Sequence, residues 1–181
     1  MVHRPKKDAT WQYEFCGHLA VVDDPEDFIH AQENPQLITD FLEVTLDLSF
    51  SPISEIYEYS KHMTEESLEV GKKAGDEHFE QIAMIDGEIR LGGKNYQIRD
   101  TLGQRDHTHG VRDWIGIGNW RYYVVWFNER LAVNPAAITT LDGRFSSGGF
   151  LFQDGNNIPL QSVRVVDERF REDGVIDQFR A

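Results

Sequence analysis

Hydrophobic and polar side chains alternate along much of this chain with a period of two residues. The clearest run covers residues 41–50, where five large apolar residues alternate with Glu43, Thr45, Asp47 and Ser49. Successive side chains of a strand point to opposite faces, so this run predicts a half-buried antiparallel strand. Similar patterns predict further strands at 12–22, 78–85, 119–127, 131–141, 148–153 and 158–170.

Glycine-containing turns separate these predicted strands. Gly92-Gly93 stands in the middle of residues 88–98 and predicts a two-residue hairpin turn, because such turns need positive φ angles. Asp142-Gly143, Asp154-Gly155 and Asp173-Gly174 mark further turns. Many short strands separated by turns are typical of an antiparallel sandwich or barrel, and we expect a barrel-like sheet.

Two short segments predict helices. Residues 25–32 follow Asp24, a residue type that caps helices, and begin with a proline. Residues 64–74 carry acidic side chains early and lysines late, and Gly75 predicts their end. Both segments are too short to form the frame of the fold, so the chain is expected to be all-β.

Length and charge narrow the classes of function. The 181 residues predict one domain, and the formal net charge of −13 disfavours nucleic acid and anionic membrane surfaces as partners. We expect no membrane span, since no apolar run approaches the roughly 18 residues required. The first residues lack an apolar segment of the kind found in secretory signals. Cys16 is the single cysteine, which favours a cytoplasmic location without an intrachain disulfide.

The segment from Arg105 to Trp114 has the most unusual composition. It reads Arg-Asp-His-Thr-His-Gly-Val-Arg-Asp-Trp, with little aliphatic content. In an extended segment Arg105, His107 and His109 share one face, and Asp106 and Thr108 share the other. Three interpretations are open: a site that moves protons, half of a metal site, or a buried polar cluster that joins two strands.

The histidine pattern argues against a metal. His107 and His109 lie on one face and could chelate an ion, but no histidine follows His109 to complete a site of the cupin type. We therefore expect no bound metal and no cofactor. If a metal did bind, Asp113 or His78 would be the third ligand. We find no nucleophile motif of the Gly-x-Ser-x-Gly type.

Acid–base chemistry is the most plausible catalytic interpretation. A carboxyl group at Asp106 in an apolar pocket could protonate a ligand, and an imidazole at His107 or His109 could hold a proton. The alternative is structural, with Arg105 and Arg112 paired to Asp106 and Asp113 across strands.

Aromatic residues gather directly after this segment. On a strand, Trp120, Tyr122, Val124 and Trp126 share one face. That face either is buried in the core or lines a cavity for a ligand. The candidate ligand-binding residues are Arg105, Arg112, Asp113, Trp114, Trp120, Tyr122 and Trp126.

Several motifs together resemble the lipocalin-like superfamily of carotenoid 1,2-hydratase (hydroxyneurosporene synthase) and AttH-type proteins, closest to its uncharacterised branch. The resemblance rests on residues 78–81, 84–89 and 103–114, and continues through the aromatic strand to Asp142-Gly143, Ser147-Gly148-Gly149-Phe150 and Asp154-Gly155. It covers most of the chain from about Trp11. The branch's hallmark resembles Arg-Asp-His-Ser-Trp-Gly-x-Arg-Asp-Trp.

The resemblance implies a calycin fold of two consecutive lipocalin-like barrels that act on or hold isoprenoids, steroids or other apolar molecules. It places Asp106, His107 and His109 at the catalytic positions, and His109 stands where the family usually carries tryptophan. Because family members are about twice as long, residues 1–181 are expected to form a single lipocalin-like β domain or the central part of a double barrel.

Two functions of different classes follow. One is a hydratase, cyclase or isomerase for a terpenoid, steroid or polyketide-like molecule. The other is a non-catalytic carrier of a hydrophobic ligand, in which the 105–114 segment only joins strands. An incomplete barrel leaves sheet edges unpaired, so we expect a homo-oligomer or association with a second chain.

Overall fold

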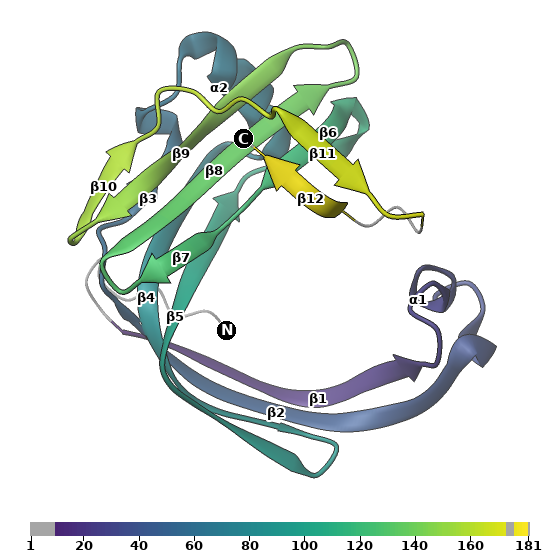
Figure 1. The fold of residues 1–181 in the computed structure, drawn as a ribbon. Helices are drawn as coiled ribbons and strands as arrows, with labels where there is room; N and C mark the ends of the chain where they lie inside the picture. The colour runs from purple at the N-terminus through teal and green to yellow at the C-terminus, as the bar shows by residue number, and fades with distance from the viewer. Residues whose placement is uncertain (1–9, 173–175, 181) are drawn as a thin grey trace. The chain divides into compact units, whose positions relative to one another are not determined.

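The computed structural model describes residues 10–172 and 176–180, without the side chains of residues 114, 176, 179 and 180. Its sheets are antiparallel, which confirms the all-β prediction (Figure 1). The strands are β1 (Trp11–Val22), β2 (Ile38–Pro52), β3 (Tyr57–Glu58), β4 (Glu77–Leu91), β5 (Lys94–His109), β6 (Ile117–Tyr122), β7 (Val125–Asn128), β8 (Leu131–Thr140), β9 (Phe145–Gln153), β10 (Asn156–Pro159), β11 (Asp167–Phe170) and β12 (Ile176–Arg180). None of the strand orders found among these residues closes into a ring.

The chain divides into two compact units, and β4 and β5 contribute residues to both. Unit 1 comprises Met1–Pro52 and Ala83–Gly103, and unit 2 comprises Ile53–Ile82 and Gln104–Ala181, each as far as its residues are described. The prediction of a single domain stays a prediction. No helix in the described residues has the length and apolar character needed to cross a membrane.

Unit 1 contains β1, β2 and the parts of β4 and β5 that lie within Ala83–Gly103. These strands belong to one sheet. The alternation at 41–50 appears as β2, which pairs with β1 on one side and with β4 on the other. Trp11, Phe50 and Ala83 form a buried apolar cluster, and Ile85 packs against it. The hairpin between β4 and β5 turns at Gly92 and Gly93, whose φ angles of 55° and 80° confirm the predicted turn.

Unit 2 contains the candidate site. Its main sheet has the strand order β10-β9-β8-β6, and β7 also pairs with β8. The short strand β3 pairs with the beginning of β4. A separate hairpin joins β11 to β12. Phe150 and Phe152 of β9 are fully buried, as are Ile82 and Val70.

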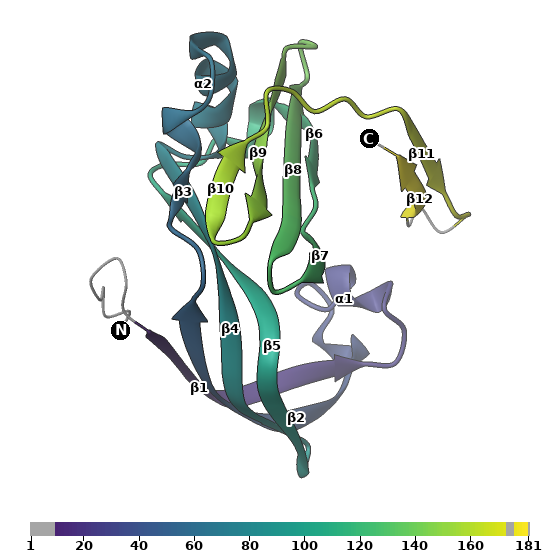
Figure 2. The same cartoon turned by 60° about the vertical axis from the view of Figure 1, so that its left-hand side comes forward.

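The two predicted helices are present but shorter than predicted. α1 spans Asp27–His30, and a backbone N–H at Glu26 donates to the carboxylate of Asp24. α2 spans Glu65–Gly71, and its cap Thr64 accepts a hydrogen bond from the Ser67 backbone. α2 packs on β9 and β8 (Figure 2). Short 3-10 turns occur at Pro35–Leu37, Tyr59–Lys61, Lys72–Ala74 and Trp114–Gly116.

Two predicted strands are interrupted. The strand expected at 119–127 breaks at residues 123–124 into β6 and β7. The cause is Pro135 of β8, which stands opposite Tyr123 and has no N–H to donate to it. The Tyr123 carbonyl accepts from the side-chain amide of Asn134 instead. The strand expected at 158–170 ends at Pro159 and resumes as β11. The turn expected at Asp173-Gly174 lies outside the described residues, as does the chain before Thr10.

Candidate functional site

His78 and Glu80 lie on the same face of β4 because strand side chains alternate. On β5, Asp106 and Thr108 also share a face and point toward them. His78 Nδ1 is 2.8 Å from Thr108 Oγ1, and it is 3.9 Å from Asp106 Oδ1. The imidazole beside Asp106 is therefore that of His78.

Glu80 is a buried carboxylate, with none of its surface exposed to solvent. Its Oε1 accepts the hydroxyl of Tyr122 at 2.8 Å and lies 3.0 Å from His78 Nε2. Its Oε2 accepts the Gln104 amide N–H at 2.8 Å. A buried carboxylate is stable when donors satisfy both of its oxygens, and all three of these partners can donate. Protonated His78 would also supply a compensating positive charge.

Tyr122 comes from β6 and joins the cluster to the main sheet of unit 2. Its oxygen donates to Glu80 and accepts from Gln104 Nε2 at 3.1 Å. Burial, followed by the nearby charge of Glu80, raises the pKa of Tyr122 well above its ordinary value of 10.0. The hydroxyl therefore keeps its proton throughout the physiological pH range.

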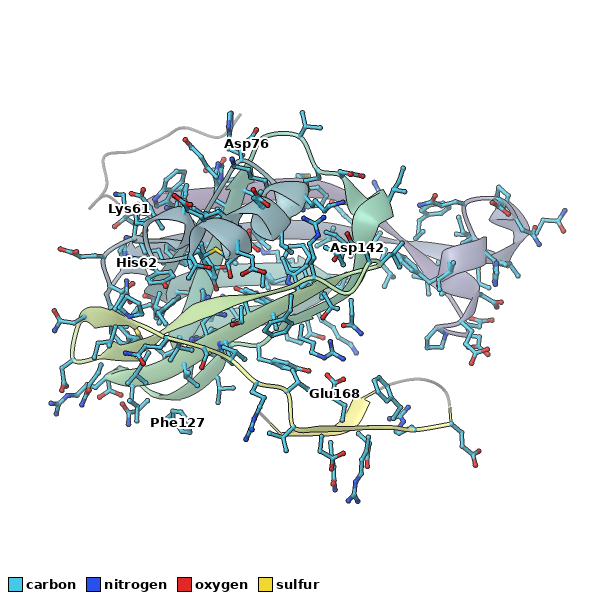
Figure 3. The ribbon with its side chains drawn as sticks, turned by 90° about the horizontal axis from the view of Figure 1, so that it is seen from above. Lys61, His62, Asp76, Phe127, Asp142 and Glu168 are labelled. Atoms are coloured by element: carbon cyan, nitrogen blue, oxygen red, sulfur yellow. The ribbon has the colours of Figure 1, made fainter. Side chains whose placement is uncertain are left out.

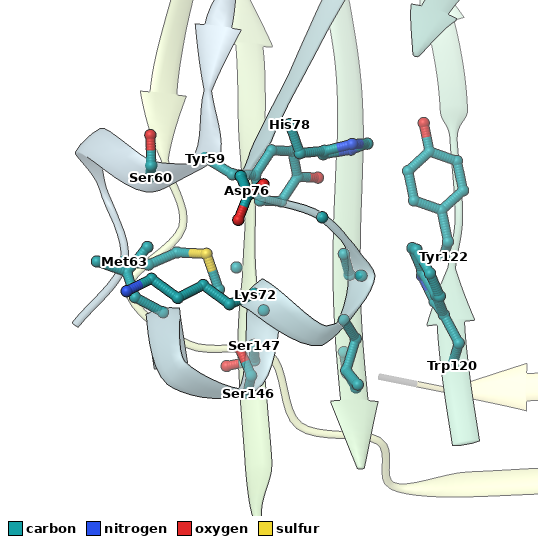
Figure 4. A pocket seen from close by; sticks show the side chains of 18 residues that line it. Tyr59, Ser60, Met63, Lys72, Asp76, His78, Trp120, Tyr122, Ser146 and Ser147 are labelled. Carbon is teal, nitrogen blue, oxygen red and sulfur yellow. The ribbon is translucent and has the colours of Figure 1, made fainter. Parts of the chain in front are cut away.

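A cavity of about 200 Å³ opens beside this cluster, and His78 and Tyr122 form part of its wall (Figure 4). The cavity lies between the α2 region and strands β6, β8 and β9, and it is partly open to solvent. Most of its lining is apolar, from Met63, Leu68, Ala74, Trp120, Ala136, Ala137 and Ile138. The lining also includes the charged residues Lys72 and Asp76. An apolar cavity that contains a few polar groups is the usual form of a small-molecule site.

Two tyrosines support the cluster from β3 and the turn after it. The ring of Tyr59 meets His78 edge to face at 4.9 Å, and its hydroxyl donates to Asn134 Oδ1 at 2.7 Å. The hydroxyl of Tyr57 donates to the Gly149 carbonyl at 2.8 Å. Burial raises the pKa of Tyr57 to about 12 and that of Tyr59 well above its ordinary value. Both hydroxyls thus act as fixed donors.

The other face of β5 carries Arg105 and His107, as the alternation predicts. The guanidinium of Arg105 lies 5.0 Å from the centre of the Phe79 ring, and its Nη2 donates to Gln81 Oε1 at 3.3 Å. His107 stacks on the same Phe79 ring at 4.8 Å. Arg105 is buried, and Phe79 and Gln81 are among the residues that hold it.

The other sequence candidates lie around this cluster or apart from it. Trp120 and Tyr122 line the cavity as predicted. His109 is exposed, and its carbonyl accepts from the Asp76 backbone. Asp113 lies 3.9 Å from Lys73 Nζ.

Arg112 is exposed, and Trp126 on β7 is not among the lining residues. The side chain of Trp114 lies outside the described residues.

Sequence reasoning missed Glu80 as a site residue, and it named His78 only as a possible third metal ligand. The available signal was the spacing His-x-Glu at the start of the strand predicted for 78–85, which places both side chains on one face. Polar side chains at alternate positions of an otherwise apolar strand point to a buried polar cluster.

Three of these groups also satisfy the spacing of a cation site. His78, Glu80 and Asp106 each bring one ligand atom within 4.8 Å of the others. The hydrogen bonds from Tyr122 and Gln104 already account for the arrangement of Glu80 without an ion. We therefore interpret the cluster as a hydrogen-bonded network, and the absence of a bound metal stays a prediction.

Comparison with known proteins gives a family and no function. No curated protein and no solved structure matches the chain. One family model matches it over residues 1–181, and that family is described as a domain of unknown function, DUF7064. Since this match spans the whole chain, the protein belongs to the DUF7064 family.

Proposed function

We propose that unit 2 binds a small apolar molecule in its cavity and moves a proton to or from that molecule. The observation that carries the proposal is the buried carboxylate of Glu80, which is hydrogen-bonded to two residues of the cavity wall, Tyr122 and His78. A base that is hydrogen-bonded to the wall of an apolar cavity can exchange a proton with a ligand through that wall residue, as general acid–base catalysis needs.

The volume of the cavity limits the size of the molecule. A protein cavity of ~150 Å³ can hold benzene, and this cavity has about 200 Å³. The enclosed space therefore suits a compact molecule of one or two small rings, such as a small terpenoid. A steroid or a long isoprenoid chain would have to extend through the open side.

The proton path runs through Tyr122. A ligand hydroxyl or acidic C–H transfers its proton to Tyr122 Oη, while the phenolic proton moves to Glu80 Oε1 across their 2.8 Å hydrogen bond. The ligand becomes an anion, Tyr122 remains a phenol, and Glu80 becomes a carboxylic acid. Reversal of these transfers at another ligand atom completes an isomerisation. In a cyclisation, the anion attacks one carbon of a polarised double bond in the same molecule, the π bond breaks, and the anion formed at its other atom takes the proton back from Glu80 through Tyr122.

His78 stabilises this network in either protonation state. When neutral, its Nε2–H donates to Glu80 and its Nδ1 accepts from the Thr108 hydroxyl; when protonated, both nitrogens donate. Little rearrangement accompanies the change. In this proposal Glu80, Tyr122 and His78 take the roles that the sequence assigned to Asp106, His107 and His109. Asp106 is half exposed and lies 3.9 Å from His78 Nδ1, so in this proposal it influences the network only through His78.

A carrier without catalysis is the second candidate. It is favoured by the donors to both oxygens of Glu80, because a carboxylate that is satisfied in this way can simply join β4, β5 and β6. The sequence resemblance to the lipocalin-like superfamily fits either function and remains a prediction. Both functions predict binding in the cavity, and only the enzyme predicts proton transfer.

We also propose that the protein associates with a second copy. β1 is the terminal strand in the order of its sheet, and its residues Tyr13, Phe15 and Leu19 are exposed. An exposed apolar edge strand readily pairs with another chain. Sedimentation should detect a dimer or larger assembly at micromolar concentration, and a stable monomer would contradict this proposal.

Nitrobenzisoxazole is a suitable probe of the proton-transfer step. A base removes its ring C–H proton as the N–O bond breaks, and the coloured cyanophenolate product is measured by absorbance. We expect the rate with Glu80→Gln to fall ~10²-fold or more below that of the unmodified protein. Glu77→Gln, an exposed glutamate on the same strand, is the matched control and should keep the rate. If the probe binds but the Glu80→Gln rate equals that of the unmodified protein, the carrier function is correct.

A further inference from the structure

Three of the hydroxyl groups that line the cavity share one property, which is that each already donates its hydrogen to an acceptor of the protein. Tyr122 donates to Glu80 Oε1, Tyr59 donates to Asn134 Oδ1 at 2.7 Å, and Ser146 donates to the Ser67 carbonyl at 3.1 Å. These three side chains therefore present oxygen lone pairs to a ligand and not hydrogens.

The orientation of the Gln104 amide strengthens this assignment for Tyr122, the wall residue that is bonded to Glu80. Its nitrogen lies 2.8 Å from Glu80 Oε2, where the amide oxygen would be repelled by the carboxylate. The same nitrogen donates to Tyr122 Oη at 3.1 Å. Gln104 and Glu80 thus hold the phenol with its hydrogen directed at Glu80 and its oxygen available as an acceptor.

His78 offers no free nitrogen to a ligand. Its Nδ1 is 2.8 Å from Thr108 Oγ1, and its Nε2 is 3.0 Å from Glu80 Oε1. The side chain therefore contacts the cavity with ring atoms that are already oriented by its two partners. At this end of the cavity, Tyr122 Oη is the atom most suited to bind a polar group of the ligand.

We propose that the ligand is a compact apolar alcohol whose hydroxyl donates to Tyr122 Oη. This inference rests on the proposed function and specifies the class of its ligand. A ketone of the same shape, bound with its oxygen at this position, would face the lone pairs of Tyr122, and its carbonyl oxygen would lack a donor there. A site built to accept a hydroxyl proton discriminates against an analogue that lacks one.

Borneol and camphor test this inference, because they share one bicyclic skeleton and differ in carrying a hydroxyl or a carbonyl. Their dissociation constants are measured by isothermal titration calorimetry. We expect borneol to bind about tenfold more tightly or better, which corresponds to one hydrogen bond of ~1.4 kcal/mol. Equal affinity, or tighter binding of camphor, would overturn the inference.

Two conservative variants locate the effect. Tyr122→Phe keeps the ring and removes the acceptor, so the preference for borneol should disappear. Tyr96→Phe removes the hydroxyl of an exposed tyrosine on β5 that is not among the cavity-lining residues, and it should retain the preference. A preference that survives in Tyr122→Phe would contradict the role of Tyr122. Circular dichroism of both variants verifies that they fold.

The same titrations separate this inference from the proposed function. If both compounds bind equally well, the cavity is a ligand site and only the alcohol assignment fails. If neither compound binds to the unmodified protein, the proposed cavity function fails together with the inference.

Discussion

The hydroxyl of Tyr122 on β6 donates to the carboxylate of Glu80 on β4 at 2.8 Å, and Glu80 is wholly buried. This bond joins an acidic group in the interior to a residue that lines an apolar cavity. Because a buried carboxylate needs a full set of donors, the bond contributes to the stability of the fold and also to the chemistry that we propose.

Replacement of Glu80 should separate these two contributions. Glu80→Ala removes the acceptor of Tyr122, Gln104 and His78 and leaves a void, so the free energy of unfolding should fall by ~3–5 kcal/mol. Glu80→Gln keeps the shape and one acceptor oxygen, so its loss should be clearly smaller. Urea denaturation of both variants and of the exposed control Glu77→Ala measures the difference. Equal stabilities of Glu80→Ala and the control would contradict the burial of this network.

Asp106→Asn should have little effect on stability. The side chain of Asp106 is 52% exposed and lies 3.9 Å from His78 Nδ1, a distance at which the attraction is weak in water. The expected loss is below ~0.5 kcal/mol, as for other surface substitutions. A thermal melt checks this, and a loss of several kcal/mol would mean that Asp106 belongs to a buried ion pair.

The ion pair between Arg121 on β6 and Glu168 on β11 predicts a pH dependence. Two hydrogen bonds of 2.5 and 2.6 Å join the side chains, and Figure 3 shows Glu168 on the β11–β12 hairpin. The Arg121 guanidinium lowers the pKa of Glu168 below its ordinary value of 4.5. A lowered folded-state pKa stabilises the fold at pH values above the unfolded-state pKa, and this stabilisation is lost as pH falls through the folded-state value.

Glu168→Gln tests this pH dependence. At pH 7 the variant should be less stable than the unmodified protein by about 1 kcal/mol, the magnitude of a partly exposed ion pair. The gap should close as the pH falls below about 4.5. Denaturation series at several pH values measure the gap, and a difference that is the same at every pH would contradict the assignment.

The sequence predicted the strands of this fold better than the site. The alternation at 41–50 and the Gly92-Gly93 turn are local signals, and both predictions are confirmed by β2 and the β4–β5 hairpin. The break after Tyr122 depends on Pro135 in a neighbouring strand, and the strand pairing that brings the two together cannot be read from either segment alone.

Which residues of β5 face His78 and Glu80 depends on a shift of one residue in the pairing of β4 and β5. Counting outward from the hairpin turn pairs Glu88 with Gln97, and these two are hydrogen-bonded at 2.7 Å. The same count pairs His78 with His107. In the structure His78 instead meets Thr108, one residue further along β5, and His107 stacks on Phe79.

Asp100 lies between the two parts of the hairpin that differ in register. Its φ angle is 46°, in the left-handed region, and its N–H donates to Asp86 Oδ1. These features indicate a β-bulge, which adds one residue to β5. The bulge explains why Asp106 and Thr108 reach His78, a relationship that simple alternation could not predict.

The bulge makes Asp100 sensitive to substitution. A β-branched residue strongly disfavours a positive φ, whereas aspartate tolerates it, so Asp100→Val should lower the free energy of unfolding by ~1–2 kcal/mol. Thr101→Val, at the next and also exposed position, is the matched control and should change stability little. Urea denaturation compares the two. If Asp100→Val is as stable as the control, the positive φ is absent in solution.

A crystal structure of the protein with borneol tests the central claim most directly. We expect one molecule in the cavity of unit 2, in contact with Trp120, with its hydroxyl within hydrogen-bonding distance of Tyr122 Oη and the Tyr122–Glu80 bond intact. Borneol bound only outside this cavity, or bound inside it with its hydroxyl directed at Lys72 and away from Tyr122, would contradict the account.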